Sequence, residues 1–575
     1  MGNKTFPFLR KLNSPLILWV APLTFLVIFY FYPLGRILLI SLARSEGSLA
    51  SPFFKAISSP TVRNVLWFTI WQATVSMILT LLIGLPGAYI FARYEFRGKT
   101  FLQALTGIPF VMPTLVVASA FNALIGPRGW INIALMELFN LAYPPLRLTN
   151  TIAAILIAHV FYNTTIVLRL VGDFWSHLNP RIDQAARTLG ANRWQTMYHI
   201  TLPLLMPATM AAALLVFIFD FTSFGVILVL GGPRFATLEV EIYYQTIALF
   251  NLPLAAVLSI LQLSCTLVLT IIYTRLSSRV TYPLELRPRS YTQRRFSNWH
   301  NRLLATLMIL ILLLLLTMPL IALATRSIVR LDPERGRREV IAKGFTLDFY
   351  RELFINRRES LFYISPINSI GVSLSYANLT IIFSLLLGLP ASWALARNSG
   401  SLLNRILDPI LMLPLGTSAV TLGLGFIVAL NRPPLNFRAS PMLIPLAHTL
   451  VAFPFVVRSL IPALRSIQPR LRQAAFVLGA SPAKVFLYID LPLVGRALLV
   501  AAIFAFTISM GEFGATALIS RPEFPTIPIA IYRFISQPGA LNYGQALALS
   551  TILMCITALG MLTIERFRIA KVGEF

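Results

Sequence analysis

Two acidic residues lie within apolar stretches of this 575-residue sequence and are its strongest candidates for contact with a solute. Asp220 and Glu512 would be costly to place inside a membrane, and an ionisable residue found there is therefore commonly functional. A pair of carboxylates would suit a positively charged solute. The alternatives are a structural pair with a buried arginine, or a position near the membrane surface.

Two histidines, His159 and His448, occupy matching positions in an internal repeat of the sequence. A metal site needs further ligands at suitable spacing, and no carboxylate or thiol lies beside either histidine along the chain. We therefore expect structural hydrogen bonding and no metal site. Cys265 and Cys555 lie inside apolar runs, where a free cysteine behaves as a small hydrophobic residue.

The sequence contains no Gly-x-x-x-x-Gly-Lys-Ser/Thr phosphate-binding loop. We therefore expect that this chain binds no ATP, carries no cofactor and is not an enzyme. Any energy from ATP hydrolysis would have to come from a separate subunit, which would bind the nucleotide and Mg²⁺.

The elements that position these residues are long apolar runs. The chain is 57% hydrophobic and only 12% charged, with a mean hydropathy of +0.75, and its runs of about 20 residues match the thickness of a bilayer core. We predict an all-α polytopic membrane protein with about twelve spans, centred on Leu16–Gly35, Val65–Phe91, Leu105–Ile125, Ile152–Leu170, Pro207–Leu230, Leu254–Tyr273, Leu303–Ala322, Ile370–Ala394, Leu407–Leu430, Leu443–Val457, Ala497–Ile519 and Ala546–Leu562.

The net charge of +27 comes from Lys and Arg between these runs. Basic segments tend to stay on the cytoplasmic side, which predicts that both termini are cytoplasmic. The exception is Arg326–Arg358, which would lie outside although it is rich in arginine. Nucleic acid is not an expected partner, because the sequence has no basic helix with interleaved aromatic residues.

The sequence is a tandem duplication. A shift of 289 residues aligns His159 with His448 and continues without a gap to Ile242-Tyr243 and Ile531-Tyr532, whereas Gly84-Leu85-Pro86 matches Gly388-Leu389-Pro390 at a shift of 304. The difference indicates an insertion in the first half, around Pro127–Leu148. We predict a first half of six spans over residues 1–276, a cytoplasmic linker over 277–302 and a second half of six spans over 303–575.

The best-matched segments of the repeat are Pro180–Pro203 and Pro469–Pro492, named here the paired loops. Each reads Gln-Ala-Ala, three residues, Gly, nine residues, Ile-x-Leu-Pro. This pattern predicts a short helix, a glycine stop at Gly190 or Gly479, and a second short helix. The alanines keep the first helix slim, so that another protein surface could approach it closely.

The paired loops resemble the EAA loops of binding-protein-dependent ABC importer permeases of the type I architecture. The resemblance implies that each loop forms a coupling helix docked in a cleft of an ATPase subunit, so that one chain meets two ATPase copies. The usual leading Glu is replaced by Gln in both loops, which removes an ion pair but not a hydrogen bond. The residues carried over are Gln184, Ala185, Ala186, Gly190, Leu202, Pro203, Gln473, Ala474, Ala475, Gly479, Leu491 and Pro492.

The same resemblance implies a bacterial inner-membrane protein that receives its solute from an extracytoplasmic binding protein. It also implies that the spans carrying Asp220 and Glu512 line the path, with Phe224 and Phe513 beside them. Gly231–Tyr243 and Ser509–Gly514 are similar to the fused permeases of thiamine and ferric-iron importers. An ion-coupled secondary transporter with two parallel six-helix halves is the alternative, although it would not need the paired loops.

Overall fold

The computed structural model describes residues 17–42, 51–280, 293, 299–330, 344–355, 365–397, 402–433 and 435–569. These residues form a helical bundle with one two-stranded hairpin, in which β1 (Asn431–Arg432) pairs antiparallel with β2 (Leu435–Asn436). Ten helices are long and apolar enough to cross a membrane, and two further bent helix pairs raise the total to as many as twelve. The prediction of an all-α chain with about twelve spans is confirmed.

In the first half, long helices alternate with short helices and turns. Its elements are α2 (Ile17–Leu26), π-helical η1 (Val27–Phe31), α3 (Tyr32–Leu42), α4 (Ser51–Ser58), α5 (Pro60–Arg93), α6 (Lys99–Val111), α7 (Thr114–Ile125), α8 (Trp130–Leu138), α9 (Ile152–His177), α10 (Pro180–Thr188), α11 (Arg193–Thr196), π-helical η2 (Met197–Thr201), α12 (Leu202–Phe221), α13 (Gly225–Leu230), 3₁₀-helical η3 (Gly232–Arg234), α14 (Leu238–Ile247) and α15 (Leu252–Val280).

The second half repeats this order from α17 onward. Its helical elements are α17 (Trp299–Arg326), α18 (Asp348–Arg351), 3₁₀-helical η4 (Glu352–Phe354), α19 (Asn368–Arg397), α20 (Leu402–Met412), 3₁₀-helical η5 (Leu413–Gly416), α21 (Ala419–Ala429), α22 (Leu443–Arg465), α23 (Pro469–Val477), α24 (Pro482–Val485), π-helical η6 (Phe486–Asp490), α25 (Leu491–Gly511), α26 (Gly514–Ile519), α27 (Ile527–Ile535) and α28 (Ala540–Ile569).

Small residues bring two long helices together at the same place in each half. A Cβ atom added to Gly84 on α5 would lie 2.7 Å from the side chain of Val167 on α9. In the second half, a Cβ on Gly388 of α19 would lie 2.6 Å from Val456 on α22. The glycines therefore permit a close approach of the two backbones, as is common between helices in membranes.

The two halves interlock through their first helices. In the first half, α2 packs on α19 and α3 on α21, and in the second half α17 packs on α7 and α28. Trp19 of α2 belongs to the same buried cluster as Phe426 and Phe453 of the second half. Each half therefore covers apolar surface of the other, in addition to a buried cluster that the second half forms by itself around Val456, Leu460 and Val494.

Four predicted spans are interrupted. The third and ninth are bent pairs, α6 with α7–α8 at 108° and α20–η5 with α21 at 96°. The fifth and eleventh spans were predicted to continue to Leu230 and Ile519, but their long helices end at Phe221 and Gly511, and α13 and α26 follow after short breaks. The predicted linker falls mostly on residues 281–292 and 294–298, which lie outside the described residues, while α15 continues into it as far as Val280.

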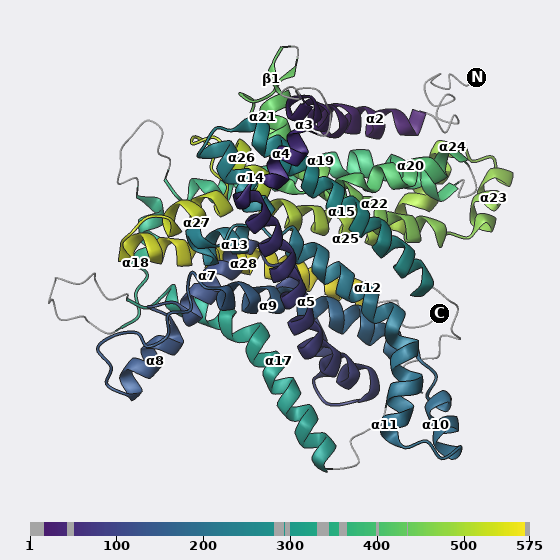
Figure 1. Cartoon of the computed structure of the whole chain (residues 1–575). Coiled ribbons are helices and arrows are strands. Elements are labelled where there is room, and N and C mark those ends of the chain that lie inside the picture. Colours follow the sequence, from purple (N-terminus) through teal and green to yellow (C-terminus); the bar gives the residue numbers. More distant parts are fainter. Residues whose placement is uncertain are drawn as a thin grey trace.

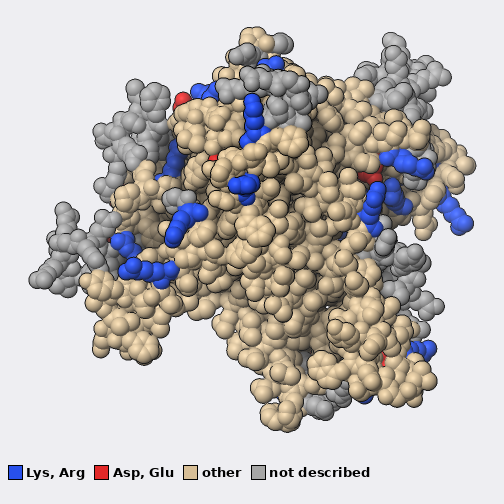
Figure 2. Space-filling model, in the orientation of Figure 1, with Lys and Arg blue, Asp and Glu red and all other residues tan. Residues whose placement is uncertain are grey.

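Figure 1 shows α10 and α11 at the lower right of the molecule, α23 and α24 at its upper right, and α8 and α18 at the left. The paired loops therefore lie at the opposite side of the bundle from α8, which occupies the insertion predicted around Pro127–Leu148. In the space-filling view, Lys and Arg gather toward the right-hand and left-hand sides, and a broad uncharged area lies across the lower middle of this face (Figure 2).

Candidate translocation site and paired loops

A cavity of about 420 Å³ lies between the two halves. It is bordered by the end of α12 and the break after it, which contribute Asp220 and Phe224, and by Ser418 and Phe513 from the second half. The breaks between α12 and α13 and between α25 and α26 bring these residues to the interface of the halves. A cavity with both halves in its wall is a position at which a solute could pass between them.

The first acid predicted from sequence, Asp220, lies at the edge of this cavity and is 1% exposed. Its Oδ1 accepts a hydrogen bond of 2.7 Å from the side-chain amide of Asn163 on α9 and lies 3.4 Å from Nδ1 of His159. Its Oδ2 has no hydrogen-bond partner among the described residues, although the equally unpartnered hydroxyl of Ser76 lies nearby. Asp220 is therefore a carboxylate with spare acceptor capacity beside the cavity.

The second acid, Glu512, has a different environment. One of its oxygens accepts the backbone N–H of Ala515 at 2.7 Å, and the other accepts the backbone N–H of Thr516 at 3.1 Å and also contacts the Thr516 hydroxyl. Glu512 thereby caps the N-terminus of α26, where a negative charge is favoured. Its carboxylate faces a helix end, and the cavity wall beside it is formed by Gly511 and Phe513.

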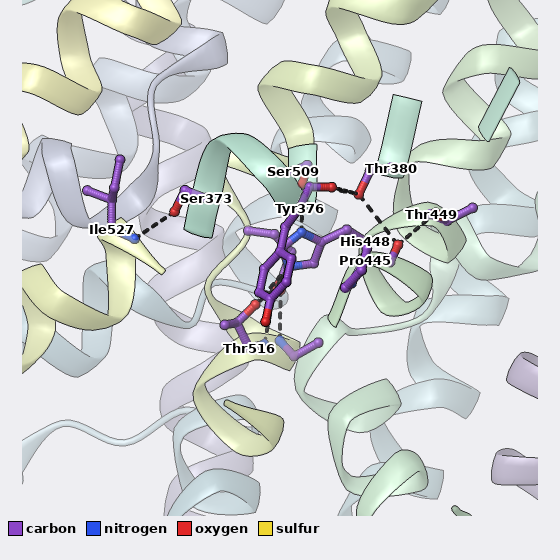
Figure 3. A network of polar contacts seen from close by, with 11 residues as sticks. Ser373, Tyr376, Thr380, Pro445, His448, Thr449, Ser509, Thr516 and Ile527 are labelled. Carbon is purple, nitrogen blue, oxygen red and sulfur yellow. Dashed lines mark hydrogen bonds and ion pairs between the residues drawn. The ribbon is translucent and has the colours of Figure 1, made fainter. Parts of the chain in front are cut away.

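Each acid contacts a histidine, and the expectation that no carboxylate lies beside the histidines is wrong in space. His448 Nε2 lies 3.2 Å from Glu512, while its Nδ1 hydrogen-bonds with Ser509 at 2.7 Å (Figure 3). Sequence spacing does not reveal these contacts, because each histidine and its acid stand on neighbouring helices far apart along the chain. The described residues contain no group of three or more His, Cys, Asp or Glu that could hold a metal.

The acid and the serine exchange places around the two histidines. The 289-residue shift relates Asp220 to Ser509 and Ser223 to Glu512. His159 accordingly has the acid at Nδ1 and hydrogen-bonds with Ser223 at 2.8 Å through Nε2, whereas the order at His448 is reversed. One histidine-centred polar network thus occurs twice, with the negative charge on opposite sides.

The second-half network extends to neighbouring helices. Figure 3 shows Thr380 of α19 between Ser509 of α25 and Pro445 of α22, and its hydroxyl makes hydrogen bonds of 3.2 Å to the Ser509 hydroxyl and 3.4 Å to the Pro445 carbonyl. Nearby, Ser373 accepts the backbone N–H of Ile527 at 2.8 Å, and Thr69 accepts that of Leu238 at 3.0 Å in the first half. These contacts hold α19, α22, α25 and α27 in register around the break after Gly511.

Four aromatic rings meet where the two halves face each other. Phe224 and Phe513 stack with centroids 5.4 Å apart and an interplanar angle of 21°. Each also contacts a tyrosine of its own half, Tyr243 or Tyr532, at 5.4 Å. The phenylalanines that sequence analysis selected only for their positions beside the acids thus form a direct contact across the interface.

Sequence analysis missed the role of a third acid, Glu239 on α14. It is 1% exposed, accepts a hydrogen bond from Gln262 of α15, and reaches across the interface to the hydroxyl of Ser418, which caps α21. The position equivalent to Glu239 in the second half is Pro528, so this polar contact occurs once. The available signal was a pair of acids, Glu239 and Glu241, at the start of α14, at positions where the repeat has Pro528 and Ala530.

The paired loops have closely matched backbones. In each, Gly190 or Gly479 has a left-handed φ, +91° or +79°, and the backbone N–H after it returns to the carbonyl of Ala186 or Ala475. This pattern ends α10 and α23 in the way that glycine permits. Both loops then pass through a π-helical segment, η2 or η6, before the long helix begins at Leu202-Pro203 or Leu491-Pro492.

The ends of the loops expose apolar side chains. Leu189, Val477 and Leu478 are each at least 87% exposed, and Gln184 with Ala185, like Gln473 with Ala474, also lies on the exposed surface. Ala186 is buried and Ala475 is half-buried. Exposed apolar groups of this kind, at the end of the bundle and clustered around a helix, indicate a protein interface.

Comparison with known proteins gives matches over both halves. Residues 84–282 and 388–570 match the family model described as binding-protein-dependent transport system inner membrane component. The chain is 27% identical to a thiamine transport system permease protein of Escherichia coli over 505 residues, covering 86% of this chain and 87% of that protein. It is 28% identical to the protein of the same description from Brucella abortus, covering 88% of both.

Other matches are shorter or more distant. A sulfate transport system permease protein of Escherichia coli is 30% identical over 229 residues, covering 40% of this chain and 80% of that protein. Among solved structures, a chain of a bacterial alginate ABC transporter in complex with a periplasmic protein aligns with a TM-score of 0.36 and 17% identity, covering 48% of this chain and 95% of that chain.

Proposed function

This chain belongs to the family of binding-protein-dependent transport system inner membrane components, and from that premise we propose that it imports thiamine or a similar organic cation. It is the membrane permease subunit of an ABC importer and has no catalytic domain. The proposal is supported by the similarity to thiamine permeases over 86–88% of the chain. Ferric iron, the other cation considered from the sequence, is the competing substrate.

The carrying observation is the cavity between the halves, with Asp220 at its edge and phenylalanines in its wall. Thiamine carries a positively charged aromatic ring, for which a carboxylate and aromatic faces are complementary partners. The carboxylate of Asp220, which borders the cavity, supplies the negative contact. Phe224 and Phe513 close the passage between the halves, and their separation opens it. Glu512 shapes the wall by capping α26.

ATP-driven movement enters through the paired loops. Two copies of an ABC ATPase subunit bind the exposed helices α10 and α23, one copy to each. Gln184 and Gln473 supply hydrogen bonds where a glutamate would supply an ion pair, and Leu189 and Leu478 supply apolar contact. Gly190 and Gly479 hold each loop in the shape that fits the ATPase. ATP and Mg²⁺ are bound by those subunits.

The side of the molecule that carries α8 and α18 faces away from the cytoplasm and receives the solute from its binding protein. This orientation places the paired loops and both termini in the cytoplasm. It is supported by the opposite positions of these elements in Figure 1 and by the basic segments around the loops. Proteolysis of right-side-out and inverted vesicles, read with antibodies to tags at each terminus, tests it.

Reconstituted transport tests the substrate. The chain, its ATPase and its binding protein are placed in proteoliposomes, and uptake of radiolabelled thiamine is measured with and without ATP. We expect ATP-dependent uptake that excess unlabelled thiamine suppresses. ATP-dependent uptake of radiolabelled ferric iron without thiamine uptake would assign the competing substrate, and uptake driven by an ion gradient without ATP would contradict the ATPase-driven mechanism.

A further inference from the structure

A polar contact ties each paired loop to the end of its π-helical segment, and the two contacts have different chemistry. In the first half, the Thr201 hydroxyl donates to Oδ1 of Asp183 on α10 at 3.1 Å. The 289-residue shift converts this pair into Asp490 and Arg472, and Nε of Arg472 on α23 donates to Oδ1 of Asp490 at 2.8 Å. The acid is on the loop helix in one half and at the base of the long helix in the other.

The first-half tie has an additional anchor. Oδ2 of Asp183 pairs with Nη2 of Arg93, at the end of α5, at 2.9 Å. The 304-residue shift relates Arg93 to Arg397 at the end of α19, whose side chain lies outside those described. In the second half, the side chain of Asp490 is 2% exposed and that of Arg472 25% exposed, so this pair is largely removed from water.

These two contacts span the glycine turn and the π-helical segment that follows it in each connection. Thr201 and Asp490 are the last residues of η2 and η6, which separate the loop helices from α12 and α25. A π-helical segment is a rare interruption that occurs frequently at functional sites, and its hydrogen-bond register differs from that of the helix on either side. A displacement of α10 or α23 could be absorbed there if only the backbone carried it.

We propose that the Asp183–Thr201 and Arg472–Asp490 contacts transmit the displacement of the paired loops to α12 and α25. Both long helices lead directly to the breaks that carry Phe224 and Phe513, so rigid attachment at their bases moves the aromatic pair. These four are positioning residues, which act through the long helices and do not contact solute. The inference rests on the proposed docking of ATPase subunits to the paired loops.

The first-half pair suggests a double substitution that should restore the contact in the second half. Arg472→Asp places two acids together, and Asp490→Thr leaves Arg472 without its acid. Combined, the two substitutions rebuild the Asp–Thr pair of the first half, with Arg397 at the position equivalent to Arg93. Thr201→Val is a milder test in the first half, because it removes the hydroxyl donor and keeps the side-chain shape. Arg496→Ala on exposed α25 surface is the control.

The readout is how nucleotide changes the separation of positions 224 and 513. In the permease–ATPase complex in nanodiscs, Cys265 and Cys555 are replaced by Ser, and Phe224→Cys with Phe513→Cys report separation through oxidative cross-linking. We expect ATP with vanadate to lower the cross-link yield in this parent.

Arg472→Asp, Asp490→Thr and Thr201→Val should each weaken that response by about two- to thirtyfold, with the ATPase still co-purifying, and the double variant should regain it. Arg496→Ala should match the parent.

The outcomes separate this inference from the proposed function. A parent that responds while all three single variants respond equally overturns the role of the ties and leaves the ATPase-driven mechanism intact. A double variant that stays as weak as its singles also overturns it, because a reconstructed tie should transmit. A parent whose cross-link yield does not change with nucleotide overturns the proposed mechanism and, with it, the role of the two contacts.

Discussion

At the scale of single residues, the two acids have different hydrogen-bonding environments although they lie at nearby positions of the repeat. Asp220 has an oxygen without a partner among the described residues, at the edge of the cavity, whereas both oxygens of Glu512 accept backbone N–H groups of α26. A substitution that removes only charge therefore tests solute binding at Asp220 and helix capping at Glu512.

We predict that Asp220→Asn lowers thiamine uptake in proteoliposomes by roughly tenfold or more, because a hydrogen bond to a charged group contributes about 1.5–3 kcal/mol. Assembly with the ATPase should persist, since Asn keeps the size of the side chain. Ser509→Ala, at the equivalent position of the second half, is the matched control and should have a smaller effect. Unchanged uptake by Asp220→Asn would remove this carboxylate from the path.

The sequence was sufficient to identify Asp220, Glu512 and the two histidines as candidates, because charged and polar groups stand out within apolar runs. Their pairing could not be predicted, since it depends on how α9 packs on α12 and α22 on α25. The contact between Glu239 and Ser418 has the same origin. It joins two halves whose relative placement no local pattern specifies.

At the scale of elements, close helix packing depends on glycine at one position in each half. We predict that Gly84→Ala and Gly388→Ala each destabilise the protein by about 1–3 kcal/mol, because the added methyl group overlaps Val167 or Val456. Thermal unfolding in detergent measures the loss. Gly371→Ala, on the same helix as Gly388 but with no atom within 4 Å of its Cβ, is the control. Equal midpoints for all three variants would contradict the packing argument.

The glycines of the paired loops act through backbone conformation. A side chain at Gly190 or Gly479 would meet no atom within 4 Å, but the φ values of +91° and +79° strain any β-branched residue. We predict that the double variant Gly190→Val/Gly479→Val assembles and hydrolyses ATP but loses uptake, measured as solute transported per ATP. Wild-type uptake by this variant would show that loop shape is not required.

The helix breaks mark the limit of prediction at this scale. Apolar length indicates that a segment can cross a membrane, and it located the long helices, although some ends were missed: α9 continues past the predicted Leu170 to His177, and α22 past Val457 to Arg465. It does not reveal that α12 stops at Phe221 or that α6 meets α7 at a sharp angle. Polar contacts from other helices, such as the capping of α26 by Glu512, stabilise these breaks, so they depend on the assembled bundle.

At the scale of the whole molecule, the halves are held together by packing as well as by the covalent connection. We predict that fragments 1–290 and 291–575, produced together, co-purify and support ATP-dependent uptake, because α3 packs on α21 and α17 on α7. Pull-down of one tagged fragment measures the association. A first fragment beginning at residue 51, which lacks α2 and α3, should bind less. Separation of the intact fragments on mild extraction would contradict the interlocked arrangement.

The exchanged loop contacts also bear on how such a chain can diverge after duplication. Identical halves would necessarily carry the same pair twice, so the present difference arose after the two copies became free to vary independently. No single substitution converts Asp183 with Thr201 into the counterpart of Arg472 with Asp490, and each intermediate brings like charges together or strands a charge. Descendants should therefore change both members of a pair together, and a lineage that has made this exchange should not return to two identical pairs through single substitutions.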